Sequence, residues 1–249
     1  MKQRIRQCFG KAASSYSKAA SVQRVVARNC AALCPEEYFR NVLDIGSGVG
    51  FLHDELRERI SCGNYVSLDL VRPMLMEQNN SGAFLVAADG EELPFAAERF
   101  DLLVSSSAMQ WYGAPETTIP RSFEVLKSGG RFAVAIFTHG TLAELADVSA
   151  RTGFGSVKEL KPNSFYKELF YSMSGLKVDY ASEEHVVFFP SVKHFLKQHK
   201  MTGAVASSEN LSWGREKYRR FVEEYENLYR GESGIKASYK VFFAYGRKL

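Results

Sequence analysis

The sequence predicts an α/β fold: a mostly parallel, seven-stranded sheet with helices on both faces. Three observations carry this prediction. Strand-like and helix-like segments alternate from residue 41 to residue 138, a glycine-rich turn follows the first strand, and an acid follows each of the next two strands. Such alternation is typical of parallel sheets with crossover helices. Ligands of such sheets bind at the carboxyl ends of the strands, so we expect a site at that edge.

Short apolar runs bounded by turn residues define the expected elements. We expect strands near residues 41–46, 64–69, 83–88, 100–105, 131–138, 176–189 and 236–247. We expect helices near residues 49–60, 72–79, 115–126, 141–151 and 162–173. The run Ser128-Gly129-Gly130 is interpreted as the signal that ends the helix before the fifth strand.

A chain of 249 residues with 45% hydrophobic and 24% charged residues is ordinary for one globular domain. We expect the ligand-binding core to comprise residues 40–189 and 235–249. Residues 1–35 are predicted to form a helical arm, and residues 190–230 a helical lid inserted before the last strand.

The glycine-rich turn lies in residues 41–50, which read N-V-L-D-I-G-S-G-V-G. Glycines at this spacing let the backbone turn tightly and approach a ligand. Dinucleotide sites place a pyrophosphate at such a turn, but an acid inside the motif, Asp44, would repel it. The acid suits a ligand with a cationic amino group and a sulfonium, which favours S-adenosylmethionine (SAM) over NAD. The predicted cofactor residues of this turn are Asp44, Gly46, Ser47, Gly48 and Gly50.

Two further acids follow the second and third strands. A carboxylate at Asp69 can hold the hydroxyls of a ribose, and one at Asp89 can accept the exocyclic amine of adenine. The remaining predicted cofactor residues are Tyr16, Leu70, Met74, Gly90 and Ser105. Tyr16 would close over the bound cofactor from the arm; a tyrosine that only packs its helix is the plainer alternative.

These motifs, together with D-G-E-E-L-P-F at residues 89–95, resemble the class I SAM-dependent methyltransferases over roughly residues 40–140. The resemblance implies a Rossmann-like sheet whose last strand is antiparallel and lies between strands five and six. It also implies that the arm and the insertion fold over the cofactor edge and shape the acceptor pocket.

Three segments outside the glycine turn indicate which family of methyltransferases the chain resembles. They are F-G-K-A-A-S-S-Y at residues 9–16 with V-Q-R at 22–24, S-S-S-A-M-Q-W at 105–111, and F-T-H-G-T-L-A-E-L at 137–145. This pattern is similar to the malonyl-[acyl-carrier protein] O-methyltransferases. Methylation of the free carboxylate of a malonyl thioester, an early step of biotin synthesis, is then implied, with S-adenosylhomocysteine as the second product. The alternative is a small-molecule carboxyl methyltransferase of the trans-aconitate type.

The chain departs from the family pattern at three positions. Gly90 stands where alanine or isoleucine is frequent, Arg72 where a serine precedes the proline, and Tyr112 where cysteine is common. None of these departures removes a motif position.

Methylation of a carboxylate needs no catalytic base, because a carboxyl group is already ionised at neutral pH. The chain should instead position the acceptor and exclude water from it. The predicted positioning residues are Tyr16, Arg24, Gln110 and Trp111, with Lys200 as a further candidate cation. For Trp111, plain core packing is the alternative.

The formal net charge of +4 is unevenly distributed. Residues 1–40 carry eight Lys or Arg against two Glu, and residues 191–220 carry seven against two. The resemblance implies an acyl-carrier protein as the partner, and its acidic surface would suit these segments; a solvated helix face is the alternative reading. The basic segments lack the interleaved aromatic residues expected of a nucleic-acid site, so no nucleic-acid partner is predicted.

Other partners and cofactors are not indicated by the sequence. Four cysteines without a C-x-x-C pair, and five scattered histidines, predict free thiols and no metal site. No apolar run reaches the ~20 residues of a membrane span, and the basic start has no signal-peptide core. We therefore expect a cytoplasmic monomer without a membrane partner.

Overall fold

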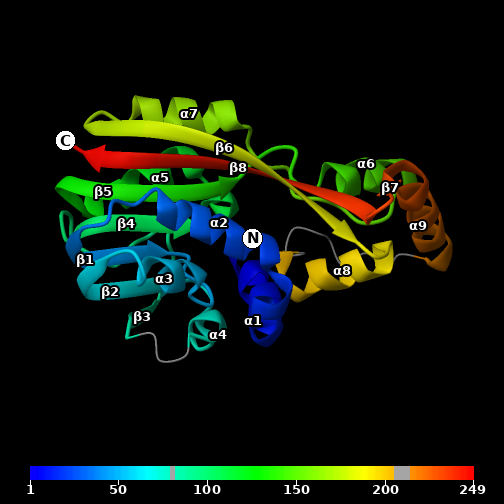
Figure 1. Cartoon of the computed structure of the whole chain (residues 1–249), viewed down its shortest axis with the longest axis horizontal. Coiled ribbons are helices and arrows are strands. Elements are labelled where there is room, and N and C mark those ends of the chain that lie inside the picture. The colour runs from blue at the N-terminus through cyan, green and yellow to red at the C-terminus, as the bar shows by residue number, and fades with distance from the viewer. Residues whose placement is uncertain (79–81, 205–213) are drawn as a thin grey trace.

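A computed structural model describes residues 1–78, 82–204 and 214–249 of the chain, and a single mixed sheet lies at its centre (Figure 1). The strands lie in the order β3-β2-β1-β4-β5-β8-β6, with β7 paired to β8. Their bounds are β1 (Tyr38–Ile45), β2 (Ser61–Asp69), β3 (Phe84–Ala87), β4 (Phe100–Ser106), β5 (Leu126–Phe137), β6 (Leu176–Phe189), β7 (Arg230–Gly231) and β8 (Gly234–Lys248).

The predicted architecture is confirmed, with one strand more than expected. Strands β1 to β5 pair in parallel, whereas β8 is antiparallel to both of its neighbours, β5 and β6. The additional strand, β7, has two residues and forms a tight hairpin with the start of β8.

Helices cover both faces of this sheet and one of its ends. The α-helices are α1 (Lys2–Ala19), α2 (Ser21–Ala32), α3 (Phe51–Leu56), α4 (Arg72–Leu75), α5 (Pro115–Ser122), α6 (Ala143–Thr152), α7 (Asn163–Ser172), α8 (Val192–Met201) and α9 (Arg215–Tyr229). Two short 3₁₀ turns are η1 (Met109–Trp111) and η2 (Phe123–Val125). The helices expected at 49–60 and 72–79 are shorter than predicted, and residue 79 lies outside the described residues.

Alternation along the strands divides the core into two layers. Val42 of β1 faces α1, α2 and α3, while its neighbour Leu43 faces α5 and α7. Fully buried residues of α2, such as Val26 and Cys30, pack against the sheet. The second half of the predicted arm is therefore part of the core, and α1 also joins it through buried side chains such as Ile5 and Ala13.

A third apolar cluster lies where β6 and β8 extend past the other strands. It joins α6, α8 and α9 around buried side chains such as Phe195, Phe221 and Tyr225 (Figure 1). Helix α8 also packs against α1, and the Ser15 hydroxyl donates to the carbonyl of Met201 over 3.0 Å. The two segments predicted to flank the core are thus neighbours, although residues 205–213 of the insertion lie outside the described residues.

The interpretation of the two glycines before the fifth strand was wrong. Gly129 and Gly130 lie inside β5, which begins at the buried Leu126. The pairing of β5 with β4 shifts register across this segment, and Gly129 has a φ of 79°. A glycine in the left-handed region fits a β-bulge as well as a helix end, so the sequence signal was ambiguous.

Candidate functional site

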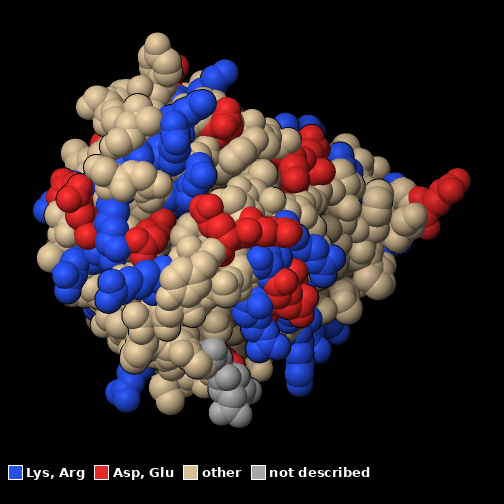
Figure 2. Space-filling model, turned by 60° about the vertical axis from the view of Figure 1, so that its left-hand side comes forward, with Lys and Arg blue, Asp and Glu red and all other residues tan. Residues whose placement is uncertain are grey.

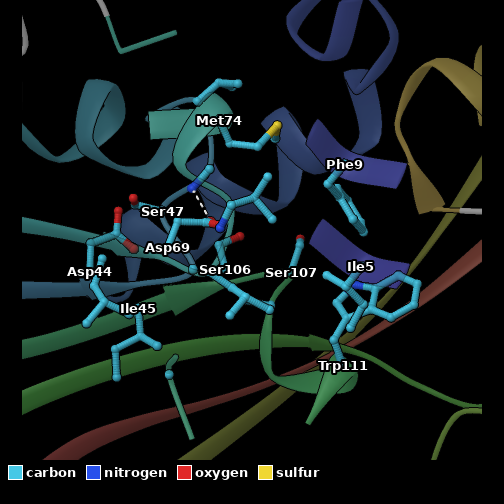
Figure 3. Close-up of a pocket in the computed structure, with 18 of the residues that line it drawn as sticks. Ile5, Phe9, Asp44, Ile45, Ser47, Asp69, Met74, Ser106, Ser107 and Trp111 are labelled. Carbon is cyan, nitrogen blue, oxygen red and sulfur yellow. Dashed lines mark hydrogen bonds between the residues drawn. The ribbon is translucent and has the colours of Figure 1, made fainter. Parts of the chain in front are cut away.

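The turn between β1 and α3 forms one wall of a cavity at the carboxyl edge of the parallel strands. Gly46 and Gly48 have positive φ values of 73° and 54°. A Cβ at Gly46 would lie 2.2 Å from the Cβ of Ala108, so only glycine lets the turn pass the segment after β4. Figure 3 shows Ser47 and Ile45 on one side of the cavity, with Phe9 and Trp111 opposite them.

Asp44 is fully buried and lines this cavity. Its Oδ2 accepts a hydrogen bond from the Tyr65 hydroxyl over 3.1 Å, whereas Oδ1 has no hydrogen-bond partner within the described residues. Burial raises the pKa of Asp44 to about 7; the Tyr65 hydroxyl opposes this shift and the nearby Asp69 adds to it. A buried carboxylate oxygen without a donor is suited to a cationic group of a ligand.

Asp69, at the end of β2, points into the same cavity (Figure 3). Its oxygens accept hydrogen bonds from the backbone N–H groups of Gly48, at 2.9 Å, and Val71, at 2.7 Å. Burial raises its pKa to about 6, and the two N–H donors limit that rise. Since each carboxylate oxygen can accept more than one hydrogen bond, Asp69 both fixes the turn and retains capacity for ligand hydroxyls.

Asp89 lies at the cavity edge in an ion pair with the arm. The ammonium of Lys2 is 2.6 Å from its Oδ2 and 2.9 Å from Oε2 of Glu91. Glu91 Oε1 also accepts from the N–H groups of Gly113 and Ala114 at 2.8 and 3.2 Å. Lys2 and these donors hold the pKa of Glu91 below its usual value against the effect of burial. Helix α1 is thus tied to the rim of the cavity.

A second cavity adjoins the first and is lined both by helices of the arm and the insertion and by loops and strand ends of the core. Tyr16, Gln23, Ser107 and Trp111 line both cavities, as does Phe9. The second is otherwise lined by residues of α1, α2 and α8, by the ends of β5 and β6 and the segment after β5, by Tyr239 of β8, and by the segment around residues 156–160. Ser107 has a φ of 59°, and such strain in a non-glycine residue is typical of functional sites.

Most predicted site residues meet at these two cavities. Those that line the first are Tyr16, Asp44, Gly46, Ser47, Gly48, Asp69, Leu70, Met74, Asp89, Gly90 and Trp111. Tyr16 and Trp111 also line the second cavity, together with Gln110.

Four predicted residues lie elsewhere. The hydroxyl of Ser105 is buried and donates to the Ile45 carbonyl over 2.8 Å, while Gly50 has a φ of 90° and precedes α3. The guanidinium of Arg24 stacks 4.0 Å from the Phe51 ring centroid. Lys200 is exposed on α8, and none of these four side chains lines either cavity.

Three residues at the site were not identified from the sequence. Gln78 donates to the Ser47 hydroxyl and the Gly48 carbonyl at 3.0 and 2.8 Å, which supports the glycine turn. Glu91 joins the arm to the rim, as described above. Lys158 extends into the second cavity, where its ammonium donates to the Gln110 carbonyl. Each acts through partners more than 20 positions away, so no local pattern indicates it.

The part of the chain that the structure describes contains neither a candidate metal site nor a candidate membrane span. There, no three His, Cys, Asp or Glu side chains gather in a way that could hold a metal ion. Nor does any described helix combine the length and apolarity needed to cross a bilayer.

Comparison with known proteins identifies the class. Residues 43–134 match the protein family described as "Methyltransferase domain". A putative methyltransferase of Haloferax volcanii, solved with the Trm112 methyltransferase activator, superposes with a TM-score of 0.63 at 19% identity, over 98% of each chain. The fold is therefore that of a methyltransferase.

Relatives that match nearly the whole chain identify the family within this class. The chain is 30% identical to the malonyl-[acyl-carrier protein] O-methyltransferase of Geobacter sulfurreducens, over 99% of each protein. It is also 28% identical to the "Biotin biosynthesis bifunctional protein BioHC" of Cellvibrio japonicus, of which it spans only 49%. The chain belongs to the malonyl-[acyl-carrier protein] O-methyltransferase family.

Proposed function

We propose that this chain transfers the methyl group of SAM to the free carboxylate of a malonyl thioester on an acyl-carrier protein. The observation that carries this proposal is the extent of the similarity. The methyltransferase-domain match ends at residue 134, but the Geobacter relative matches 99% of the chain. Its similarity therefore includes α1, α8 and residues 156–160, which line the second cavity.

The first cavity fits SAM on the chemistry of its lining. The unpartnered oxygen of buried Asp44 would take the amino group, and Asp69 the ribose hydroxyls. Both oxygens of Asp89 already have partners, Lys2 and the Glu91 N–H, so its contact with an adenine amine remains a prediction. When bound, SAM supplies an electrophilic methyl group.

The residues shared by the two cavities are suited to orienting the acceptor and excluding water. Phe9 and Trp111 form an edge-to-face pair with centroids 5.5 Å apart, and Phe9 also lies 6.4 Å from the Tyr16 ring. Burial raises the pKa of Tyr16, so its hydroxyl is neutral. A dry, aromatic junction leaves a carboxylate poorly solvated and hence more nucleophilic.

In the direct test, purified protein is incubated with methyl-labelled SAM and one of three acceptors: malonyl-carrier protein, malonyl-coenzyme A or trans-aconitate. A base-labile labelled ester on the malonyl thioester is expected. Label on trans-aconitate alone would instead assign the chain to the small-molecule carboxyl methyltransferases. Absence of label from all three acceptors, with SAM bound, would overturn the proposed reaction.

We also propose that the carrier protein docks on α1 and α8. Within the described residues, Arg4, Arg6 and Lys11 form no salt bridge with an acid. By contrast, Arg219 of α9 is neutralised by Glu216 and Glu223. On the face drawn in Figure 2, basic and acidic side chains are interspersed rather than gathered in one basic stripe.

Charge reversal tests this docking surface. Changing Arg4, Arg6 and Lys11 to Glu should raise KM for malonyl-carrier protein but not for malonyl-pantetheine, which has no carrier domain. The matched control is a Lys167→Glu, Lys177→Glu variant, with both changes at exposed positions of α7 and β6. An unchanged KM for the carrier substrate would exclude the arm as the docking site.

A further inference from the structure

The two cavities differ in the charge of their linings. Four acids line the first cavity, namely Asp44, Asp69, Asp89 and Glu91, against one cation, Lys2. Of the described residues lining the second cavity, none is Asp or Glu, and Lys158 is the sole Lys or Arg. The first lining suits a cationic ligand and the second an anionic one.

Lys158 is held where an acceptor would meet the cofactor cavity. Its ammonium donates to the carbonyl of Gln110 and lies 5.0 Å from the ring centroid of Trp111, which lines both cavities. An ammonium has three donors, so two remain for a ligand. The hydroxyl of Ser107, on the wall shared by the cavities, has no partner among the described residues and is a second available donor.

The other polar groups of the second cavity cannot replace this cation. Burial lowers the pKa of His199 to about 4, so its ring is neutral at physiological pH. Burial raises the pKa of the Tyr239 hydroxyl, aided by nearby Glu144, which leaves it a neutral group. The candidate cations Arg24 and Lys200 line neither cavity.

We propose that Lys158 binds the free carboxylate of the acceptor and orients it toward the cofactor cavity. The inference rests on the proposed function and adds the residue that selects an acid-ended acyl group. Because the methyl ester is uncharged, the same contact discriminates substrate from product.

The proposal predicts that binding of the acceptor depends on pH, because it requires Lys158 to be protonated. Its half-buried position lowers the pKa of the ammonium to about 8, against the opposing effect of Glu91. Lys158 is therefore protonated below pH 8 and loses its charge as the pH rises through that value. At saturating SAM, KM for the malonyl substrate should rise above pH 8. Lys158→Arg should abolish that rise, since a guanidinium stays charged.

The decisive experiment compares malonyl-carrier protein as substrate with acetyl-carrier protein, which lacks the carboxylate, as competitive inhibitor. Lys158→Met should raise KM for the malonyl substrate about 10- to 100-fold, the range for a hydrogen bond to a charged group. The inhibition constant of acetyl-carrier protein and the Kd for SAM should remain unchanged. Lys158→Arg should retain most of the wild-type preference.

The matched control is Lys161→Met. It removes a cation three positions away that pairs with Glu116 over 3.3 Å and lines neither cavity. Equal changes of the malonyl and acetyl constants in Lys158→Met, or no change in either, would overturn the inference. If that variant does not fold, a wild-type KM that stays flat through pH 8 would overturn it. A wild-type protein that does not methylate malonyl thioesters would instead refute the proposed function itself.

Discussion

Gly90 and Tyr112, two of the positions where this chain departs from its family pattern, lie next to each other in the lining of the first cavity. A Cβ added at Gly90 would lie 2.7 Å from the Tyr112 hydroxyl oxygen and 2.9 Å from Cγ2 of Ile45. Both distances are shorter than van der Waals contact, and the backbone of Gly90 does not adopt a positive φ. The space, not the backbone conformation, therefore requires glycine, and we predict that Gly90→Ala conflicts with Tyr112.

The size of the effect follows from two opposing contributions. Overfilling a packed site costs about 1–3 kcal/mol, whereas replacing glycine by alanine gains about 0.4–1 kcal/mol by restricting the unfolded chain. The net loss in the free energy of unfolding should be about 1–2 kcal/mol. In a Tyr112→Cys background the clash with the hydroxyl is absent and only the 2.9 Å contact with Ile45 remains, so the same change should cost less. The coupling between the sites should then be about 1 kcal/mol, above the scatter of independent sites.

The assay is a double-mutant cycle of Gly90→Ala, Tyr112→Cys and the combined variant. Urea unfolding followed by circular dichroism gives the free energies, and calorimetry gives the Kd for SAM, since both residues line its proposed cavity. Because Tyr112→Cys alone leaves a void, only the coupling is diagnostic. An equal cost of Gly90→Ala in both backgrounds would refute the steric reasoning.

The remaining predictions concern two acids of the first cavity, Asp44 and Glu91. Because burial raises the pKa of Asp44 to about 7, the affinity for SAM should increase from pH 5.5 to 7.5, and binding should release a proton. In calorimetry, Asp44→Asn should weaken SAM binding and flatten its dependence on pH. For folding, the raised pKa means that the free energy of unfolding falls as the pH rises from near 4 to about 7. Asp44→Asn should reduce that slope and leave the part due to Asp69, whose pKa is also raised by burial. Glu91→Ala should lower the free energy of unfolding by about 2–3 kcal/mol, because hydrogen-bond donors now satisfied by the carboxylate would lose their acceptor. Glu91→Asp is the control. An unchanged urea midpoint in Glu91→Ala would contradict this account.

The sheet could be predicted because each strand carries a local signal. Strand β6 was expected at residues 176–189 and has those bounds, since alternating side chains mark a strand with one half-buried face. Helix ends were less predictable. Gly50 was placed inside a helix from residue 49, but its φ of 90° puts it before α3. At Gly129 the same conformational freedom produced a bulge in place of a helix end.

The residues of the candidate site likewise include some that the sequence predicted and some that it could not. Asp44 and Asp69 were predicted because the carboxyl ends of parallel strands converge on one edge, so their place in the motif determines their place in space. Lys158 has no such link: it meets the Gln110 carbonyl across 48 positions, and the segment that carries it has neither helical nor strand periodicity. The same applies to Glu91, whose backbone donors lie 22 and 23 positions away. Contacts set by the packing of loops cannot be derived from one sequence.

The separation of charge between the cavities bears on turnover. Esterification of a carboxylate removes the charge that Lys158 would bind, so the acyl product should be held more weakly than the substrate. The other product, S-adenosylhomocysteine, keeps the amino group and the ribose that Asp44 and Asp69 are suited to bind. The acceptor side of the site should therefore empty first. Loss of Lys158 should then reduce discrimination between malonyl substrate and its ester without changing inhibition by S-adenosylhomocysteine.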